Sequence, residues 1–387
     1  MKDDCQDLSV LFIGTQMATG GAQRVLLDQA SWFHTNGYQV NTAFLYDRDG
    51  LHMKWRQTYP FPIHNLEVFD PRQRIFRQLF FIPRGLWRLW KLLRQNKFDV
   101  VETFTLDSNL FVLPLAWLAG LPVRVATNHG FARNDSRLKR MSHTWLINLG
   151  GADILIAVTE DVRIQSIEEG VRPGRVAAIP NGIHLPNEHE KSATDPSKAL
   201  NIAEGTVFLL SVGRLVHEKA YEVLIRAMRI VVSEYPTVFL GIAGEGELWD
   251  ELHGLIDELN LTEKVRLLGN REDVHALTAK ADVFVMSSRS EGMPMALLEA
   301  MSFGLPVVVT RVGGLKEVVE DHSQGILVSP EDPQELAKAI LELLRDPVLG
   351  LNMGKQARRR VAEKYTTERM CRQYEKIMID LCREKKQ

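Results

Sequence analysis

Two glutamates eight positions apart, Glu291 and Glu299, are the residues of this 387-residue chain whose placement most suggests chemistry. The short apolar run 282–286 is typical of a buried strand, and the run after Pro294, placed as the first helical residue, is typical of a helix that Gly304 ends. We therefore expect Glu291 in the loop at the carboxyl end of a strand. Glu299 is expected between one and two turns into the following helix.

A sugar nucleotide is the ligand that this arrangement favours. Carboxylates accept hydrogen bonds from paired sugar hydroxyls. The N–H groups at a helix start favour an anion. Between the two glutamates, Gly292, Met293 and Pro294 bring backbone close to whatever binds there. A sugar nucleotide has a ribose, a diphosphate and a sugar in that order. Two carboxylates on either side of such a helix start could therefore bind the hydroxyls of both sugars, with the diphosphate between them.

Strands and helices alternate along both halves of the chain. The expected strands are 10–14, 40–46, 99–104, 123–128, 154–158 and 176–180, then 207–213, 238–244, 265–269, 283–287, 307–310 and 326–329. This alternation predicts parallel sheets covered on both faces, and hence an α/β fold of two doubly wound, Rossmann-like domains. Ligands of such folds bind at the carboxyl ends of strands, so we expect a central cleft that both domains face.

The expected boundaries follow from composition. Residues 1–185 form the first domain, and the polar stretch 186–204, which lacks an apolar period, forms a linker. Residues 205–365 form the second domain, and 366–387 a final helix.

Composition indicates a soluble globular protein. The net charge of −2 gives no global case for nucleic-acid binding. The three cysteines have no metal or disulfide spacing, which favours a reduced, cytoplasmic setting. The first nine residues are polar and unlike a signal peptide, and no apolar run reaches the roughly 18–20 residues of a membrane-spanning helix.

Basic residues follow the first strand of the second half. Arg214 and Lys219 lie in the expected strand-to-helix loop, where they are suited to hold a diphosphate through charge-assisted hydrogen bonds. A solvated basic pair, or an arginine bound to backbone carbonyls, is the plainer interpretation, and the nearby glutamates favour the phosphate. Arg271, after another strand, fits a place beside the nucleotide base and a surface place equally well.

Strand ends of the first half carry three more candidates. Gly20 and Gly21 open a helix after the first strand, where glycine permits close backbone approach, although a plain turn also fits. His129 ends another strand before Gly130. A lone histidine is usually structural, but this position favours a role in the site.

Two other patterns are interpreted as turns. Gly244-Glu245-Gly246 lacks the third glycine of a dinucleotide fingerprint, because position 249 is tryptophan. Asp47 and Asp49 have the D-x-D spacing of metal-bound sugar-nucleotide sites, but no cluster of further ligands supports them. We therefore expect no metal site.

The segment 71–98 combines eight Lys and Arg residues with aromatic residues and has no acidic residue. Leu86, Leu89, Trp90 and Leu93 fall on one helical face, which fits an amphipathic helix packed on the first sheet. The same composition fits contact with an anionic membrane surface, and both interpretations hold if only one side is packed. A second basic cluster follows His129: Arg133, Arg137, Lys139 and Arg140.

These motifs, in this order and spacing, resemble the retaining GT-B glycosyltransferases of family 4, the group 1 glycosyltransferases, over nearly the whole chain. The matching residues are the two glutamates with Gly-Met-Pro between them, Val212-Gly213-Arg214 with Lys219, Pro180-Asn181-Gly182-Ile183, Gly244-Glu245-Gly246, Gly313-Gly314 and the Gly-Gly-Ala-Gln run that starts at Gly20.

The resemblance implies a role for each candidate. Glu299 would accept hydrogen bonds from the ribose, and Glu291 from the transferred sugar, with help from the backbone of 292–294. Arg214 and Lys219 would bind the diphosphate. His129 would lie over the donor sugar, and Gly20 and Gly21 close to the phosphates. The final helix would cross back to the first domain, which binds the acceptor, while the second binds the donor.

The implied activity is retaining, metal-independent hexosyl transfer from a nucleoside-diphosphate sugar, with UDP favoured over GDP. The acceptor would be a glycan, a lipid-linked molecule or another envelope component, and the donor is a substrate, so no cofactor is expected. The basic-aromatic segment favours peripheral attachment to the inner face of the cell membrane. Two departures from the family pattern are Ala220, in place of the usual glycine, and His184, where aspartate is frequent.

Three other functions share part of the pattern. A nucleotide-sugar 2-epimerase has the same two-domain architecture but needs no acceptor. A dinucleotide oxidoreductase needs a glycine fingerprint after its first strand, which is absent at 14–21. A non-catalytic sugar-nucleotide-binding scaffold would not need Arg214, Lys219 and both glutamates.

Overall fold

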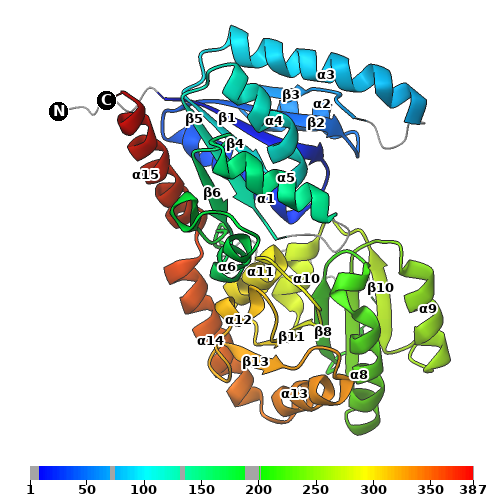
Figure 1. Cartoon of the computed structure of the whole chain (residues 1–387). Helices are drawn as coiled ribbons and strands as arrows, with labels where there is room; N and C mark the ends of the chain where they lie inside the picture. The colour runs from blue at the N-terminus through cyan, green and yellow to red at the C-terminus, as the bar shows by residue number, and fades with distance from the viewer. Residues whose placement is uncertain (1–7, 70–74, 131–135, 188–199, 201, 387) are drawn as a thin grey trace. The chain divides into compact units, whose positions relative to one another are not determined.

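The computed structural model describes residues 8–69, 75–130, 136–187, 200 and 202–386 (Figure 1). The chain divides into two compact units, one of residues 1–182 with 367–387, the other of residues 183–366. Most of the expected linker, together with Arg72, Arg74 and Arg133 of the basic clusters, lies outside the described residues. Within the described residues, no helix is both long and apolar enough to cross a membrane.

The first unit is a parallel sheet of seven strands in the order β3-β2-β1-β4-β5-β6-β7. Its strands are β1 (Ser9–Met17), β2 (Gln39–Asp47), β3 (Ile63–Asn65), β4 (Val100–Phe104), β5 (Val123–Asn128), β6 (Ile154–Ala157) and β7 (Val176–Ala178). Its helices are α1 (Gly21–Thr35), α2 (His52–Thr58), α3 (Ile75–Gln95), α4 (Leu106–Leu118), α5 (Arg137–Asn148), α6 (Glu160–Glu168) and the C-terminal α15 (Thr367–Lys386), with a 3₁₀ turn at Pro173–Arg175.

The second unit is a parallel sheet of six strands in the order β10-β9-β8-β11-β12-β13. Its strands are β8 (Val207–Val212), β9 (Val238–Ala243), β10 (Val265–Gly269), β11 (Val283–Met286), β12 (Val307–Thr310) and β13 (Gly325–Val328). Its helices are α8 (Tyr221–Glu234), α9 (Trp249–Glu258), α10 (Val274–Lys280), α11 (Met295–Phe303), α12 (Leu315–Val318), α13 (Pro333–Arg345) and α14 (Pro347–Lys364), with a 3₁₀ turn at His217–Lys219.

The α/β fold with two Rossmann-like sheets is confirmed, and each of the twelve expected strands is present with ends that differ by a few residues at most. The sequence pattern missed β3, which has three residues, of which two are polar. Apolar strands are buried because helices cover both faces of a parallel sheet. Leu11, Ile13 and Val101 pack with α3 and α4 on one face of the first sheet, for example.

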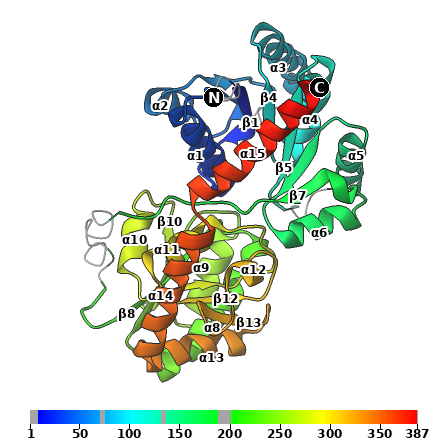
Figure 2. The same cartoon turned by 90° about the vertical axis from the view of Figure 1, so that its left-hand side faces the viewer.

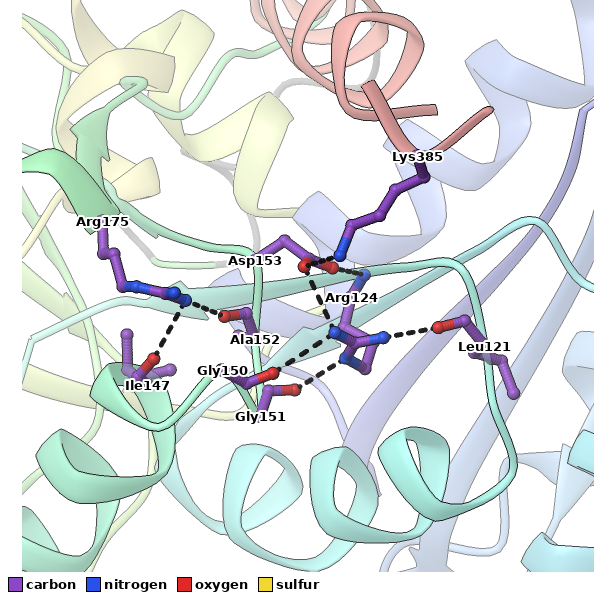
Figure 3. Close-up of polar contacts among 9 residues, drawn as sticks. All are labelled: Leu121, Arg124, Ile147, Gly150, Gly151, Ala152, Asp153, Arg175 and Lys385. Atoms are coloured by element: carbon purple, nitrogen blue, oxygen red, sulfur yellow. Dashed lines mark hydrogen bonds and ion pairs between the residues drawn. The ribbon is translucent and has the colours of Figure 1, made fainter. Parts of the chain in front are cut away.

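Polar contacts tie α15 to the first unit (Figures 2 and 3). The helix lies alongside α1, and Tyr38 donates a hydrogen bond to Glu375 at 2.6 Å. Near its end, Lys385 pairs with Asp153 at 2.8 Å, and Asp153 also pairs with the buried Arg124 at 3.2 Å. The Arg124 side chain donates to three backbone carbonyls as well, those of Leu121, Gly150 and Gly151. The final helix is therefore part of the first unit.

A fully buried carboxyl group lies in the same unit. Glu102, in the middle of β4, accepts a 2.7 Å hydrogen bond at Oε2 from Gln29 Nε2 on α1. The two remaining oxygens, Oε1 of Glu102 and Oε1 of Gln29, are buried and have no partner among the described residues. Burial raises the pKa of Glu102 well above its ordinary value, and the bond from Gln29 opposes this only in part. When the Glu102 carboxyl is protonated, its O–H group is a hydrogen-bond donor, which the two unpaired oxygens of Glu102 and Gln29 otherwise lack.

We expect Glu102→Gln to stabilise the protein at alkaline pH. Because the folded-state pKa of Glu102 is raised, the stability that the neutral acid contributes is complete below the unfolded-state pKa and is lost as the pH rises through the folded-state pKa. The loss amounts to about 1.4 kcal/mol for each pH unit that separates the two pKa values. The glutamine side chain of the variant keeps the shape of the neutral acid and does not titrate.

Urea unfolding of both proteins at pH 5 and at pH 9 measures this difference. The midpoint of the variant should exceed that of the wild type at pH 9 by more than at pH 5, while the exposed substitution Glu363→Gln should show no such trend. A variant that is less stable than the wild type by the same amount at both pH values would show that Glu102 is ionised in the fold.

Candidate functional site

In the second unit, chain topology brings the site together. The strand order reverses between β8 and β11, which are paired through Val283 with Leu209 and Phe284 with Leu210. Loops that leave the carboxyl ends of two such strands diverge and form a crevice between them. Lys219 follows β8 and Glu291 follows β11, so residues 72 positions apart in sequence meet there.

Lys219 and Glu291 form a largely buried ion pair, with side chains 18% and 10% exposed. The ammonium group of Lys219 donates to Oε1 of Glu291. Ser288 Oγ donates to the same oxygen at 2.6 Å. The hydroxyl of Thr310 donates to the backbone carbonyl of Ser288, also at 2.6 Å, and holds that residue in place. Among the described residues, Oε2 of Glu291 has no hydrogen-bond partner and remains available to a ligand.

The backbone of Glu291 is held just as closely. The N–H group of Gly314 donates to the Glu291 carbonyl at 3.1 Å. Gly313 has φ +42°, and a Cβ there would lie 1.9 Å from the same carbonyl oxygen. Glycine is required at position 313 by this approach as well as by the positive φ. This contact gives the Gly313-Gly314 motif a physical role.

The loop that carries Lys219 is fastened to the segment after β11. Ser287 Oγ donates to the carbonyls of Lys219 and Ala220, both at 3.0 Å. Arg289 donates from its backbone N–H to the Glu218 carbonyl at 2.8 Å and from its guanidinium to the His217 carbonyl at 2.6 Å. The Arg289 guanidinium also pairs with Glu222 and Glu331. Lys219 is thereby positioned by the loop that bears its partner.

Ala220, the departure from the family pattern, adopts a conformation that suits glycine. Its φ and ψ are +49° and +43°, in the left-handed region, and its side chain is buried. Such a backbone costs an alanine roughly 1–2 kcal/mol, so the surrounding contacts must offset it. Nearby, a Cβ on Gly213 would lie 2.9 Å from Tyr221 Oη and 3.2 Å from Lys219 Cε. Glycine therefore suits position 220 because of its positive φ, and position 213 because a side chain there would be crowded.

The helix after Glu291 begins one residue later than the sequence suggests. Pro294 is the N-cap of α11, with extended φ and ψ of −76° and 114°, rather than its first helical residue. Its carbonyl still accepts hydrogen bonds from Leu297 and Leu298, so its missing N–H costs the helix nothing. Gly304 ends α11 in the left-handed conformation, as expected. Glu299 lies in the second turn of the helix and is partly exposed.

The remaining donor-site candidates of this unit differ in their contacts. Arg214 is exposed, and its guanidinium has no hydrogen bond or ion pair within the described ranges. Arg271 instead forms two hydrogen bonds to Asp273, at 2.7 and 2.6 Å, so a ligand would have to compete with that carboxylate. The Gly244–Gly246 turn supports the Arg214 loop, because Leu215 N–H donates to the Glu245 carbonyl at 2.9 Å.

In the first unit, Gly20 and Gly21 lie at the start of α1, where Gly20 is the N-cap. A small pocket opens beside them at the carboxyl ends of β1 and β4, which are again neighbours at the reversal of strand order. Its lining is Gly14, Thr15, Ala22, Gln23, Leu26, Phe104 and Thr105. Thr15 and Thr105 share a 2.6 Å hydroxyl hydrogen bond. Thr105 has φ +83°, a strained conformation for a β-branched residue.

His129 lies directly after β5, and its ring stacks on Phe104 with centroids 5.9 Å apart. The residue is partly exposed, but its Nε2 atom is buried and has no hydrogen-bond partner among the described residues. Burial lowers the pKa of His129 to about 4, because the imidazolium form would lose its hydration. The imidazole is therefore neutral at pH 7.

The D-x-D spacing has a structural explanation. Asp47 accepts hydrogen bonds from the backbone N–H groups of Leu51 and His52, at 2.9 and 3.0 Å, and so supports the start of α2. Asp49 accepts a longer one from Thr19. Over the described part of the chain, no three His, Cys, Asp or Glu side chains form a group suited to a metal ion.

Sequence reasoning missed several residues that shape these sites. They are Thr15 and Thr105 in the first unit, and Ser287, Ser288 and Arg289 in the second. The three in the second unit lie two to four residues before Glu291, so proximity to the glutamate was a usable signal. Thr15 and Thr105 had no such signal, because their meeting depends on the pairing of β1 with β4.

Family models match both halves of the chain. The model described as Glycosyltransferase Family 4 matches residues 19–186, and that described as Glycosyl transferases group 1 matches residues 193–360. The Escherichia coli UDP-Gal:alpha-D-GlcNAc-diphosphoundecaprenol alpha-1,3-galactosyltransferase is 29% identical over 312 residues, 77% of this chain and 79% of the relative. An uncharacterized glycosyltransferase of Haemophilus influenzae is 24% identical over 377 residues, 95% and 98% of the two chains.

Solved structures agree with this relationship at the level of the fold. Anabaena HepE in complex with UDP and glucose superposes with a TM-score of 0.84 over 96% of this chain and 99% of its own, at 22% identity. That likeness shows the GT-B fold, and the two family models carry the assignment along the chain. The chain belongs to the GT-B glycosyltransferases of family 4.

Proposed function

We propose that this glycosyltransferase moves a hexose from a UDP-sugar to a lipid-linked or other envelope acceptor, with retention and without a metal ion. The observation that carries the proposal is the Lys219–Glu291 pair, held at the switch point of the second sheet beside the start of α11. A cation and a carboxylate in contact can grip adjacent groups of one ligand, the diphosphate and the sugar.

Departure of the nucleoside diphosphate builds negative charge, which the enzyme has to stabilise. Arg214, exposed and without a partner in the described chain, and Lys219 are the cations that would bind it, and the N-terminus of α11 would add its dipole. Each such preorganised hydrogen-bond donor contributes about 3 kcal/mol in comparable sites.

GDP-sugars remain the alternative sugar donors.

Glu291 would hold the hexose rather than attack it. One of its oxygens is already engaged by Lys219 and Ser288, which leaves Oε2 for sugar hydroxyls. Glu299, further along α11, would bind the ribose. Since neither carboxylate acts as a nucleophile in this arrangement, transfer would take place on the front face of the sugar, and the anomeric configuration would be retained. By resemblance to the family, His129, which is neutral at pH 7, would contact the donor sugar.

The acceptor assignment draws on the Escherichia coli relative, whose substrates by name are UDP-Gal and a GlcNAc-diphosphoundecaprenol. HepE, the structural relative, binds UDP and glucose. A lipid-linked acceptor requires that the enzyme work at a membrane surface, which agrees with the basic residues of the first unit.

A donor screen tests the proposal as a whole. With UDP-, GDP- and ADP-sugars and a polyprenyl-diphosphate sugar as acceptor, we expect nucleotide release from one UDP-sugar, dependent on acceptor and unchanged by EDTA. Mass spectrometry identifies the product, and NMR gives its anomeric configuration. Conversion of the donor without acceptor would indicate an epimerase, and strict dependence on manganese would contradict the metal-free mechanism.

Arg214→Ala and Lys219→Ala should each lower kcat/KM by about a hundredfold, which corresponds to the loss of one charge-assisted donor. Arg214→Ala should keep the thermal unfolding temperature of the wild type within a few degrees, whereas Lys219→Ala should lower it, because the largely buried Glu291 carboxylate loses its cation. Activity is therefore measured well below the unfolding temperature of each variant. Lys338→Ala, an exposed lysine on α13, is the matched control and should leave kcat/KM unchanged. Near-normal turnover of both loop variants would remove the diphosphate assignment.

His129→Ala should reduce kcat by a factor that is the same at every pH from 5.5 to 8.5. Since the pKa of His129 is about 4, the imidazole is neutral across that range and protonates only below it. The ratio of wild-type to variant kcat, measured at saturating donor, isolates this residue from other titrating groups. A ratio that changes severalfold near pH 6.5 would show that the imidazolium form takes part.

A further inference from the structure

Apolar side chains project from the outer surfaces of two helices of the first unit. On α5 and just after it, Leu138, Met141, Trp145 and Leu149 recur every three or four residues and are 50–73% exposed. On α4, Phe111, Trp117 and Leu118 are exposed as well. We call these seven residues the α4–α5 apolar face. Large apolar residues gathered in this way are uncommon on a soluble surface and mark an interaction site.

The two helices present this face to the same side. The connections from β4 to β5 and from β5 to β6 join parallel neighbours. Such crossovers are right-handed, so α4 and α5 cover one face of the sheet, and α3 reaches the same face after β3. Helix α4 packs against both α3 and α5, and Figure 1 shows the three in consecutive places. Side chains that point away from the sheet on these helices therefore form one continuous surface.

The helices that form this surface carry an excess of basic residues. By sequence, α3, α4 and α5 together contain eight Lys and Arg residues and a single acidic residue, Asp107. The whole chain, by contrast, has a net charge of −2. Three of the eight form ion pairs, Lys139 with Asp107, Arg88 with Glu67 and Arg140 with Glu169, and the side chain of Arg77 lies outside the described residues. Exposed Arg84, Lys91 and Arg94 border the apolar face from α3, and Lys91 lies over the ring of the exposed Trp87.

The apolar stripe that the sequence singled out on α3 is not part of this surface. Leu89 and Leu93 are buried against the first sheet, and Leu86 packs on the same core. Arg72 and Arg74 lie outside the described residues, as do the side chains of 75–80. The packed interpretation of the α3 stripe is therefore confirmed. Helix α3 instead exposes basic residues and Trp87 to solvent.

We propose that the α4–α5 apolar face inserts into the headgroup region of an anionic membrane, with the basic residues of α3 and α5 over the lipid phosphates. Tryptophan and leucine beside lysine and arginine are the composition of interfacial membrane contacts. Positive charge close to an anionic bilayer is attracted to its surface. This extends the proposed transfer to a lipid-linked acceptor by naming the surface that meets the lipid.

A second copy of the chain is a poorer occupant of this face. In a two-fold dimer the same patch meets itself, so the basic residues of both copies would be brought together. Juxtaposed like charges oppose such an interface. An anionic bilayer removes the conflict, because it supplies the opposite charge and an apolar interior at once.

Vesicle flotation of the full chain tests the proposal, with neither donor nor acceptor present, so that its outcome is independent of the transferase activity. We expect the protein to float with phosphatidylcholine vesicles that contain phosphatidylglycerol, less with phosphatidylcholine alone, and less as salt rises. Leu149→Asp should lower the partition coefficient at least about tenfold, because it places a charge in the inserted stripe.

Leu351→Asp on α14 is the matched control. Leu351 and Leu149 are the same residue type with nearly the same exposure, 65% and 66%, and the control should bind vesicles like the wild type. Circular dichroism should show both variants folded. The proposal fails if the wild type does not float at low salt, or if both variants lose binding equally. It also fails if sedimentation shows a dimer that Leu149→Asp disrupts while flotation is unchanged.

Discussion

The pairing of β8 with β11 is the constraint on which the candidate donor site depends. Because the strand order of the second sheet reverses there, the loops after these strands leave on opposite sides and enclose a crevice. Lys219 comes from one loop and Glu291 from the other, and their ion pair links the two. Without this pairing, the two charges would lie on unrelated loops.

A largely buried ion pair is costly unless its geometry is fixed, and the surroundings of Lys219 and Glu291 fix it. Ser288 holds the carboxylate, Gly313-Gly314 holds its backbone, and Ser287 with Arg289 hold the lysine loop. The strained Ala220 lies inside this set of contacts. A site that must stabilise charge as it develops gains from such rigidity, because no reorganisation is then needed during the reaction.

The first unit follows the same topology with different chemistry. Its reversal, between β1 and β4, carries neutral groups: the hydroxyls of Thr15 and Thr105 and, directly after the next strand, the neutral ring of His129. Beneath them, the buried Glu102 and Gln29 join β4 to α1. The outer sides of α4 and α5 instead expose apolar side chains, and exposed basic residues of α3 lie nearby. Neutral polar groups at the strand ends and an exposed apolar face on the outer helices thus occur in one domain.

The sequence by itself determined the fold class, the strands and the main site candidates. Apolar period and turn residues are local signals, and both glutamates lie where that pattern places them. It missed β3, which is too short to show a period, and it placed the start of α11 one residue early. Only the tertiary structure decided that Lys219 contacts Glu291, that Arg271 is engaged by Asp273, and that the α3 stripe is buried while α4 and α5 expose theirs. The reason is that strand order and helix packing join residues far apart in the chain, and no local pattern encodes which of them meet.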